Sequence, residues 1–92
     1  MQKRLECNIV GRVQMVMFRD FAQRTASRLG LVGEVWNEVD GSVSVVAEGE
    51  ESALSDLLGY LHHGPILAHV ESVHADWSAP AGTFPDFRIR YR

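Results

Sequence analysis

The sequence is short of cysteine, of basic charge and of long apolar runs, and each shortage excludes a class of protein. Cys7 is the only cysteine, so no internal disulfide can form and a reducing compartment is the simplest expectation. No apolar run approaches the roughly 18 residues that a membrane-spanning helix needs. The N-terminal residues Met1-Gln2-Lys3-Arg4 lead into an alternating pattern and not into an apolar signal segment. The formal net charge of −3 argues against a general nucleic-acid binder. We therefore expect a cytoplasmic protein with neither a membrane nor a nucleic-acid partner.

Several motifs of phosphate and hydrolase chemistry are also absent. The sequence has no G-x-x-x-x-G-K-[ST] P-loop and no G-x-S-x-G serine elbow. Val13 stands where a thiol phosphatase with Cys7 as its nucleophile would carry arginine. The four histidines match no standard zinc-ligand spacing. A catalytic site in this chain is therefore expected to use neither a protein nucleophile nor a metal.

The pattern of apolar residues predicts a mixed α+β domain. The chain has 92 residues, of which 46% are apolar, which suits one domain over residues 1–92 with a real core. Alternation with a period of two predicts strands near 4–9, 31–39, 43–47 and 87–91, and helical spacing predicts helices over 18–29 and 54–61. Asp40-Gly41 is a strong hairpin signal between two of these strands. Val70 and Val73 fall on opposite faces of a further strand, which indicates a β-bulge.

These elements follow one another in the order βαββαβ, with the final strand segment split in two. This order is typical of a ferredoxin-like sandwich, in which two helices cover one face of an antiparallel sheet. The fold hosts many activities and decides none of them. The function must therefore be argued from a local site.

The segment GRVQMVMFRDF, residues 11–21, is the best candidate for such a site. A turn from a strand into a helix exposes successive backbone N–H groups at the positive end of the helix dipole. Together these groups form a concave cradle for an anion. Arg19 in the first helical turn can add a bidentate contact to two phosphate oxygens. The alternative interpretation is an ordinary loop that carries an exposed arginine.

Residues 11–50, GRVQMVMFRDFAQRTASRLGLVGEVWNEVDGSVSVVAEGE, closely resemble the acylphosphatase family. They follow its motifs G-x-V-Q-G-V-x-F-R, A-x-x-L-G-L-x-G-x-V, N-x-x-D-G-x-V and A-E-G in order. GPILAHV at 64–70 and FRIRY at 87–91 extend the resemblance over residues 5–91. The resemblance implies the same βαββαβ fold and an enzyme that hydrolyses the carboxyl-phosphate anhydride of small acylphosphates. The products would be a carboxylate and inorganic phosphate, and neither a metal nor a cofactor would be needed.

The resemblance also implies roles for individual residues. Arg19 stands where the family places its phosphate-binding arginine, and Asn37 where it places the asparagine that orients the attacking water. The phosphate-binding loop then consists of Gln14, Met15, Val16, Met17, Phe18 and Arg19. An acylphosphate carries a good leaving group, so the enzyme needs mainly to neutralise the phosphoryl oxygens and to aim a water. A neutral amide suffices for that second task. The alternative for Asn37 is a structural polar residue next to the turn.

One departure from the family motif leaves the activity open. Met15 stands where the motif has glycine, which would suit a positive φ or a close approach to phosphate. Val16 and Met17 beside it favour a loop packed by side chains, so we expect Met15 at negative φ. Because the other site residues match the motif, we also expect an active enzyme. The alternative is a weakly active or non-catalytic module that only binds phosphate or an acyl anion.

Two other classes of protein share the predicted fold or the motifs. An RNA-binding domain of this fold would show basic and aromatic side chains on its central strands, where this sequence has Ser42, Ser44, Val46 and Glu48. A carbamoyl-phosphate-cleaving domain fused into a larger hydrogenase-maturation protein would share the motifs. Because the sequence stops at Arg92, we expect a stand-alone enzyme. We also expect a monomer that binds a small-molecule acylphosphate.

Overall fold

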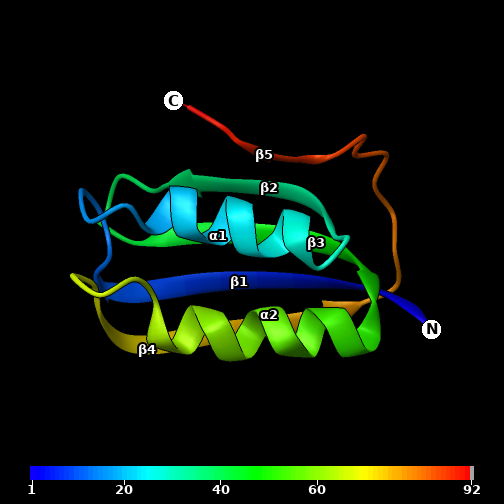
Figure 1. Cartoon of the computed structure of the whole chain (residues 1–92), viewed down its shortest axis with the longest axis horizontal. Coiled ribbons are helices and arrows are strands. Elements are labelled where there is room, and N and C mark those ends of the chain that lie inside the picture. The colour runs from blue at the N-terminus through cyan, green and yellow to red at the C-terminus, as the bar shows by residue number, and fades with distance from the viewer. Residues whose placement is uncertain (92) are drawn as a thin grey trace.

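The computed structural model, which describes residues 1–91, shows two helices packed on one face of a five-stranded sheet (Figure 1). The elements are β1 (Gln2–Arg12), α1 (Phe18–Arg28), β2 (Val32–Asn37), β3 (Val43–Glu50), α2 (Glu51–His63), β4 (His69–Ser78) and β5 (Phe87–Ile89). The strands lie in the order β4-β1-β3-β2-β5. The predicted βαββαβ order, with its last strand segment split in two, is confirmed, and so is the ferredoxin-like fold.

The sheet differs from the predicted one at a single edge. Its first four strands pair antiparallel, but β5 pairs parallel with β2, with Gly33 opposite Phe87 and Val35 opposite Ile89. The prediction of a wholly antiparallel sheet was therefore wrong. The cause is the path of residues 79–86, which cross the end of the sheet where β4 finishes and β2 begins (Figure 1). Entering from that end, β5 has to run in the same direction as β2.

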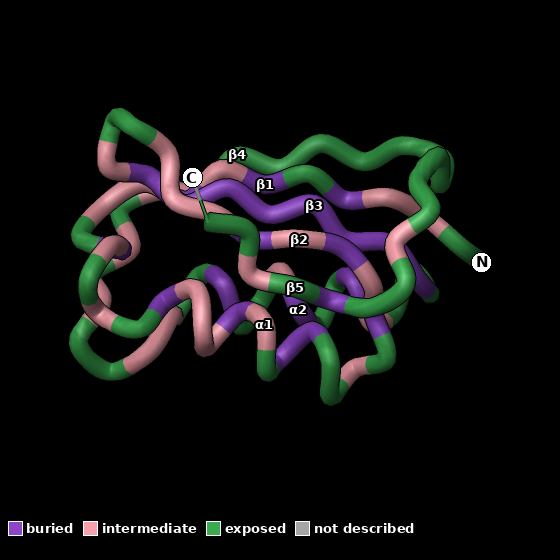
Figure 2. The backbone as a smooth tube through the Cα atoms, turned by 90° about the horizontal axis from the view of Figure 1, so that it is seen from above, coloured by how far each residue is buried: buried purple, intermediate pink, exposed green. Residues whose placement is uncertain are grey.

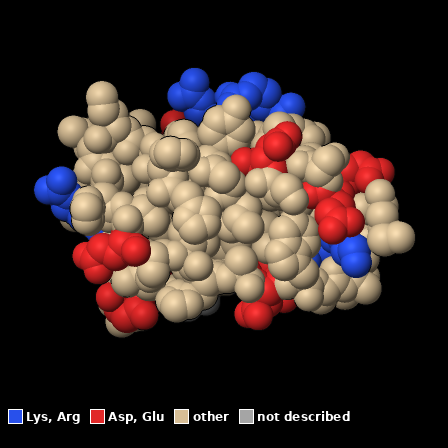
Figure 3. Space-filling view, turned by 90° about the horizontal axis from the view of Figure 1, so that it is seen from below, with Lys and Arg blue, Asp and Glu red and all other residues tan. Residues whose placement is uncertain are grey.

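The core fills the space between the sheet and the two helices. The odd-numbered side chains of β1 and β3 point toward the helices, as the alternation predicted, and Leu5, Ile9 and Val43 are fully buried there. In Figure 2 the buried residues lie along β1, β3 and β2 and on α1 and α2, the elements that enclose this core. Leu54 and Leu57 of α2 complete it. Seen from the side of α2 and β4, the surface is largely uncharged, and its charged side chains stand mostly at the margins (Figure 3).

The predicted bulge lies where β1 ends. Val10 pairs with Ser72, but Gly11 pairs with Val70, so Glu71 is an extra residue in β4. Gly11 has φ 139°, and a Cβ at this position would lie 2.1 Å from the carbonyl oxygen of His69. Only glycine fits so close an approach of two backbones. The bulge confirms the prediction and sets the point at which the chain leaves the sheet for α1.

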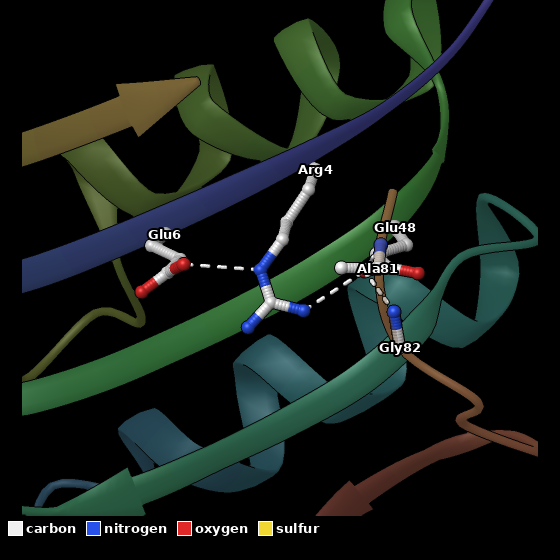
Figure 4. Close-up of polar contacts among 5 residues, drawn as sticks. All are labelled: Arg4, Glu6, Glu48, Ala81 and Gly82. Carbon is white, nitrogen blue, oxygen red and sulfur yellow. Dashed lines mark hydrogen bonds and ion pairs between the residues drawn. The ribbon is translucent and has the colours of Figure 1, made fainter. Parts of the chain in front are cut away.

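A buried carboxylate holds the long segment before β5 against the sheet (Figure 4). Oε2 of Glu48 accepts hydrogen bonds from Nη1 of Arg4 at 2.8 Å and from the backbone N–H groups of Ala81 and Gly82 at 3.0 and 2.9 Å. Burial raises the pKa of Glu48, but these three donors outweigh it and hold the pKa below its ordinary value. Nε of Arg4 donates in turn to Glu6. These hydrogen bonds of Glu48 fix the segment that leads to β5 at the far edge of the sheet.

Candidate active site

The loop between β1 and α1 has an alternating backbone. Met15 has φ 61° and Met17 has φ 67°, whereas Gln14 and Val16 have negative φ. The expectation that Met15 would have negative φ was therefore wrong. The expectation that Val16 and Met17 pack the loop is confirmed for Val16, which packs against the core, but was wrong for Met17, which is exposed, as is Met15. Turning Val16 inward between two outward methionines requires the chain to reverse at both, and each left-handed residue costs about 1 kcal/mol.

Alternating signs of φ are the backbone pattern of a loop that can bind an anion. Successive residues of alternating right- and left-handed conformation form a concave nest whose N–H groups converge on an anion. Within residues 1–91, no acceptor is paired with the N–H groups of residues 15–19. Met17 is the N-cap of α1 and offers no side-chain acceptor to the first turn. The loop therefore has the geometry and the unused donors of an anion cradle.

Arg19 stands in the first turn of α1 beside this cradle. Its guanidinium carbon lies 5.2 Å from the centre of the Tyr91 ring, a cation–π contact. No carboxylate of the described residues forms an ion pair with it. The guanidinium therefore keeps its hydrogen-bond donors for a ligand.

Asn37 faces the same cleft from the end of β2. The strand ends here, two residues before the predicted Val39, because the chain turns from Glu38 onward. In the described chain, Oδ1 of Asn37 is the only buried side-chain oxygen or nitrogen without a hydrogen-bond partner. A buried polar atom without a partner is costly and calls for a ligand or a bound water.

A cleft of about 450 Å³ brings most of the predicted residues together. Its lining comprises Val13, Met15, Met17, Phe18, Arg19, Asp20, Asn37, Ile89 and Tyr91. The side chains of Gln14 and Val16 lie elsewhere, so these two residues can contribute only their backbone. Nε2 of Gln14 donates to the carbonyl oxygens of Glu38 at 2.8 Å and Ser42 at 2.9 Å, which ties the loop to the turn after Asn37.

The sequence analysis did not identify Ile89 and Tyr91 as lining residues. The alternation of residues 87, 89 and 91 placed them on one face of the last strand. It could not show that this face meets Arg19, because that contact depends on the pairing of β5 with β2. The missed residues come from the C-terminal end of the chain and close the cleft opposite the start of α1.

The single cysteine of the chain is not suited to act as a nucleophile. Burial, with a smaller contribution from the charge of Asp76, raises the pKa of the Cys7 thiol to about 12. A thiol of such pKa is a poor nucleophile near neutral pH. No three His, Cys, Asp or Glu residues between 1 and 91 are grouped so that they could hold a metal ion. Neither helix of the described chain combines the length and apolar character needed to cross a membrane.

Comparison with known proteins gives one consistent answer. The family model described as acylphosphatase matches residues 5–89. An acylphosphatase of Salinibacter ruber is 49% identical over 97% of this chain and 94% of its own length. One from Methanococcoides burtonii is 48% identical over 92% of this chain and 88% of its own. The crystal structure of acylphosphatase from Bacillus subtilis superposes with a TM-score of 0.94 at 32% identity, covering 97% of this chain and 99% of that one.

Proposed function

The chain belongs to the acylphosphatase family and is an acylphosphatase, and on that premise we propose how its cleft hydrolyses an acylphosphate. The phosphoryl group lies in the cradle formed by the N–H groups of residues 15–19, and the guanidinium of Arg19 binds two of its oxygens. Asn37 orients the attacking water. One observation above all supports this assignment: Asn37, whose buried Oδ1 has no hydrogen-bond partner among the described residues, lines the same cleft as Arg19 and the alternating loop.

Each part of the cleft has a distinct task. The water is held through a hydrogen bond to Oδ1 of Asn37, which accepts from it and leaves a lone pair of the water aimed at phosphorus. As its oxygen attacks, the bond between phosphorus and the acyl oxygen breaks, and the electron pair leaves with the carboxylate. The proton of the water passes to solvent. Arg19 and the loop N–H groups stabilise the charge on the phosphoryl oxygens throughout.

We propose that this reaction is metal-independent. Its leaving group is a carboxylate, which departs without a general acid. A guanidinium and preorganised backbone donors stabilise the negative charge on the phosphoryl oxygens. A divalent cation has this role in other phosphoryl-transfer sites. Small acylphosphates such as acetyl and benzoyl phosphate are the simplest substrates that combine a phosphoryl group with a carboxylate leaving group.

Hydrolysis in the presence of a chelator tests this function directly. We expect the protein to release inorganic phosphate from acetyl phosphate and benzoyl phosphate at the same rate with and without EDTA. A requirement for added Mg²⁺ or Zn²⁺ would overturn the metal-independent mechanism. Binding of phosphate without turnover would instead favour the anion-binding module that the change from glycine to Met15 suggested.

We also propose that the protein acts as a cytoplasmic monomer without a nucleic-acid partner. The single, buried Cys7 suits a reducing compartment, and the net charge of −3 does not favour a polyanion. Light scattering after size-exclusion chromatography should give a mass near 10.3 kDa. A mass of twice that value would contradict the monomer.

A further inference from the structure

Two methionine side chains stand in solvent at the mouth of the cleft. Met15 is 99% exposed and Met17 is 68% exposed, yet both line the cleft. Both have positive φ, which is unfavourable for a residue with a side chain. Neither side chain is packed in the protein's own core. Exposed apolar surface beside a binding cleft is typical of a ligand contact.

The cleft offers different surroundings to the two ends of a substrate. Arg19, Asn37 and the loop N–H groups serve the phosphoryl end. The rest of the lining is mainly apolar, and Met15, Met17 and Tyr91 form its outer part, where the chain meets solvent. An acyl group attached to the bound phosphoryl group must extend past these side chains. An apolar acyl group would cover them and remove apolar surface from water.

The charges around the cleft act against an acyl group that is itself anionic. Among the described lining residues, Arg19 is the only basic one, and the phosphoryl group occupies it. Asp20 is the only acidic one, and it lies 3.4 Å from Arg24 in an exposed ion pair. A second negative charge on the substrate would therefore meet apolar side chains and a carboxylate, without a cation of its own.

Resting on the proposed function, we propose that Met15, Met17 and Tyr91 form an apolar rim that selects acylphosphates with a bulky, uncharged acyl group. The methionine side chains are unbranched and flexible, so they adapt to acyl groups of different shape. The rim therefore selects a chemical class, that of apolar acyl groups, and disfavours acyl groups that carry a carboxylate. The methionine at position 15 thus supplies a contact that the glycine of the family motif cannot make.

The experiment compares three substrates that share a phosphoryl group and differ in the acyl group: benzoyl, acetyl and succinyl phosphate. For each, kcat/KM is divided by the rate of spontaneous hydrolysis, which removes differences in intrinsic reactivity. The test variants are Met15→Asn, Met17→Asn and the double variant, because asparagine tolerates positive φ better than other polar residues. Val39→Asn is the matched control, since Val39 is 99% exposed but does not line the cleft.

We expect the wild-type protein to prefer benzoyl over acetyl phosphate by about tenfold, and acetyl over succinyl phosphate. The double variant should reduce the benzoyl preference about threefold to tenfold, each single variant should reduce it less, and Val39→Asn should leave it unchanged. The ratio cancels any general loss of turnover, and the single variants decide the matter if the double variant fails to fold. The proposal would be overturned if folded Met15→Asn and Met17→Asn kept the wild-type ratio of benzoyl to acetyl phosphate hydrolysis. A preference of the wild-type protein for succinyl phosphate would also overturn it. No hydrolysis of any substrate would overturn the proposed function itself.

Discussion

The ring of Tyr91 covers the guanidinium of Arg19, with 5.2 Å between the guanidinium carbon and the ring centre. The neighbouring residue holds this ring in place. The backbone N–H of Arg90 donates to the carbonyl oxygen of Val35 at 2.9 Å, and its guanidinium lies 4.1 Å from the centre of the Trp36 ring. Arg90 is therefore anchored to β2, next to Asn37, while Tyr91 contacts the arginine of the cleft.

We expect Tyr91 to act as a positioning residue for Arg19. Tyr91→Leu should raise the inhibition constant of inorganic phosphate and the KM for acetyl phosphate severalfold, because Arg19 then has more conformations to lose on binding. Tyr91→Phe keeps the ring and should behave as the wild type does. Steady-state kinetics with phosphate as inhibitor measures both constants. Unchanged constants in Tyr91→Leu would contradict the positioning role. A loss in Tyr91→Phe as large as that in Tyr91→Leu would show that the hydroxyl group, and not the ring, matters.

Arg19→Ala should abolish most of the activity and leave the fold intact. Removing one preorganised anion contact costs about 10²-fold or more in rate, and the side chain forms no described ion pair that stabilises the fold. Turnover of acetyl phosphate and circular dichroism of the same sample give both readouts. Arg24→Ala, on the same helix but outside the main cleft, is the matched control and should retain activity. Near-normal turnover by a folded Arg19→Ala variant would refute the assignment.

Asn37→Ala should separate catalysis from phosphate binding. If Oδ1 orients the water, kcat should fall by about 10²-fold while the inhibition constant of inorganic phosphate changes little. Alanine also removes the buried oxygen that lacks a partner, so stability should not fall as it does when a satisfied polar group is lost. A parallel loss of turnover and of phosphate binding would mean that Asn37 builds the cradle and does not position water.

The backbone of Met15 predicts the outcome of replacing it with glycine. At φ 61°, glycine is free of the strain that any side chain carries, so Met15→Gly should bind phosphate at least as well and hydrolyse acetyl phosphate as fast or faster. Acetyl phosphate is the appropriate substrate because its acyl group is too small to use the apolar rim fully. Met15→Ala is the control, since it removes the same side chain but keeps the Cβ. Faster turnover in both variants would trace the effect to the side chain and not to φ.

Glu48 should make the stability of the protein depend on pH in the acid range. Its pKa is lower in the folded protein than in the unfolded chain, so the folded state binds its proton less readily. The stabilisation is complete above the unfolded-state pKa of about 4.3 and is lost as pH falls through the lower pKa of the folded state. Urea unfolding from pH 7 to pH 2 should show this loss in the wild type and a smaller one in Glu48→Gln. Asp56→Asn, at an exposed position on α2, should retain the wild-type slope.

The periodicity of the sequence was sufficient for the elements and for the faces that they bury. It did not reveal the direction of β5, because alternation tells which side chains share a face and not from which end a strand enters the sheet. The prediction of a negative φ at Met15 was wrong for a similar reason. Its neighbours showed which side chains turn inward, but the rotation that achieves this depends on the register at which β1 ends.

The two residues proposed for catalysis differ in how they could be found. Arg19 follows from the physical chemistry of a strand-to-helix turn, whereas the role of Asn37 came only from the family resemblance. Tyr91 required the tertiary structure, since it lies 72 positions after Arg19 along the chain. The strongest independent support for Asn37, its unpartnered oxygen, is likewise a property of the folded protein that no sequence pattern encodes.

The hydrogen bonds of Gln14 affect how freely the hairpin after Asn37 can vary. Its amide donates only to main-chain carbonyl oxygens of that turn, those of Glu38 and Ser42. Every residue type carries such an oxygen, so exchange of the turn's side chains leaves both acceptors in place as long as the turn keeps its path. Mutations in the hairpin that preserve the path of the turn therefore leave the support of the cradle intact. Asp40 is an exception, because its Oδ1 accepts from the backbone N–H and the hydroxyl of Ser42 and so helps to fix the path of the turn. Gln14 itself has no substitute that could reach both carbonyls with one amide group. In a library that randomises these positions, active clones should vary widely at the exposed residue 39 and retain glutamine at position 14.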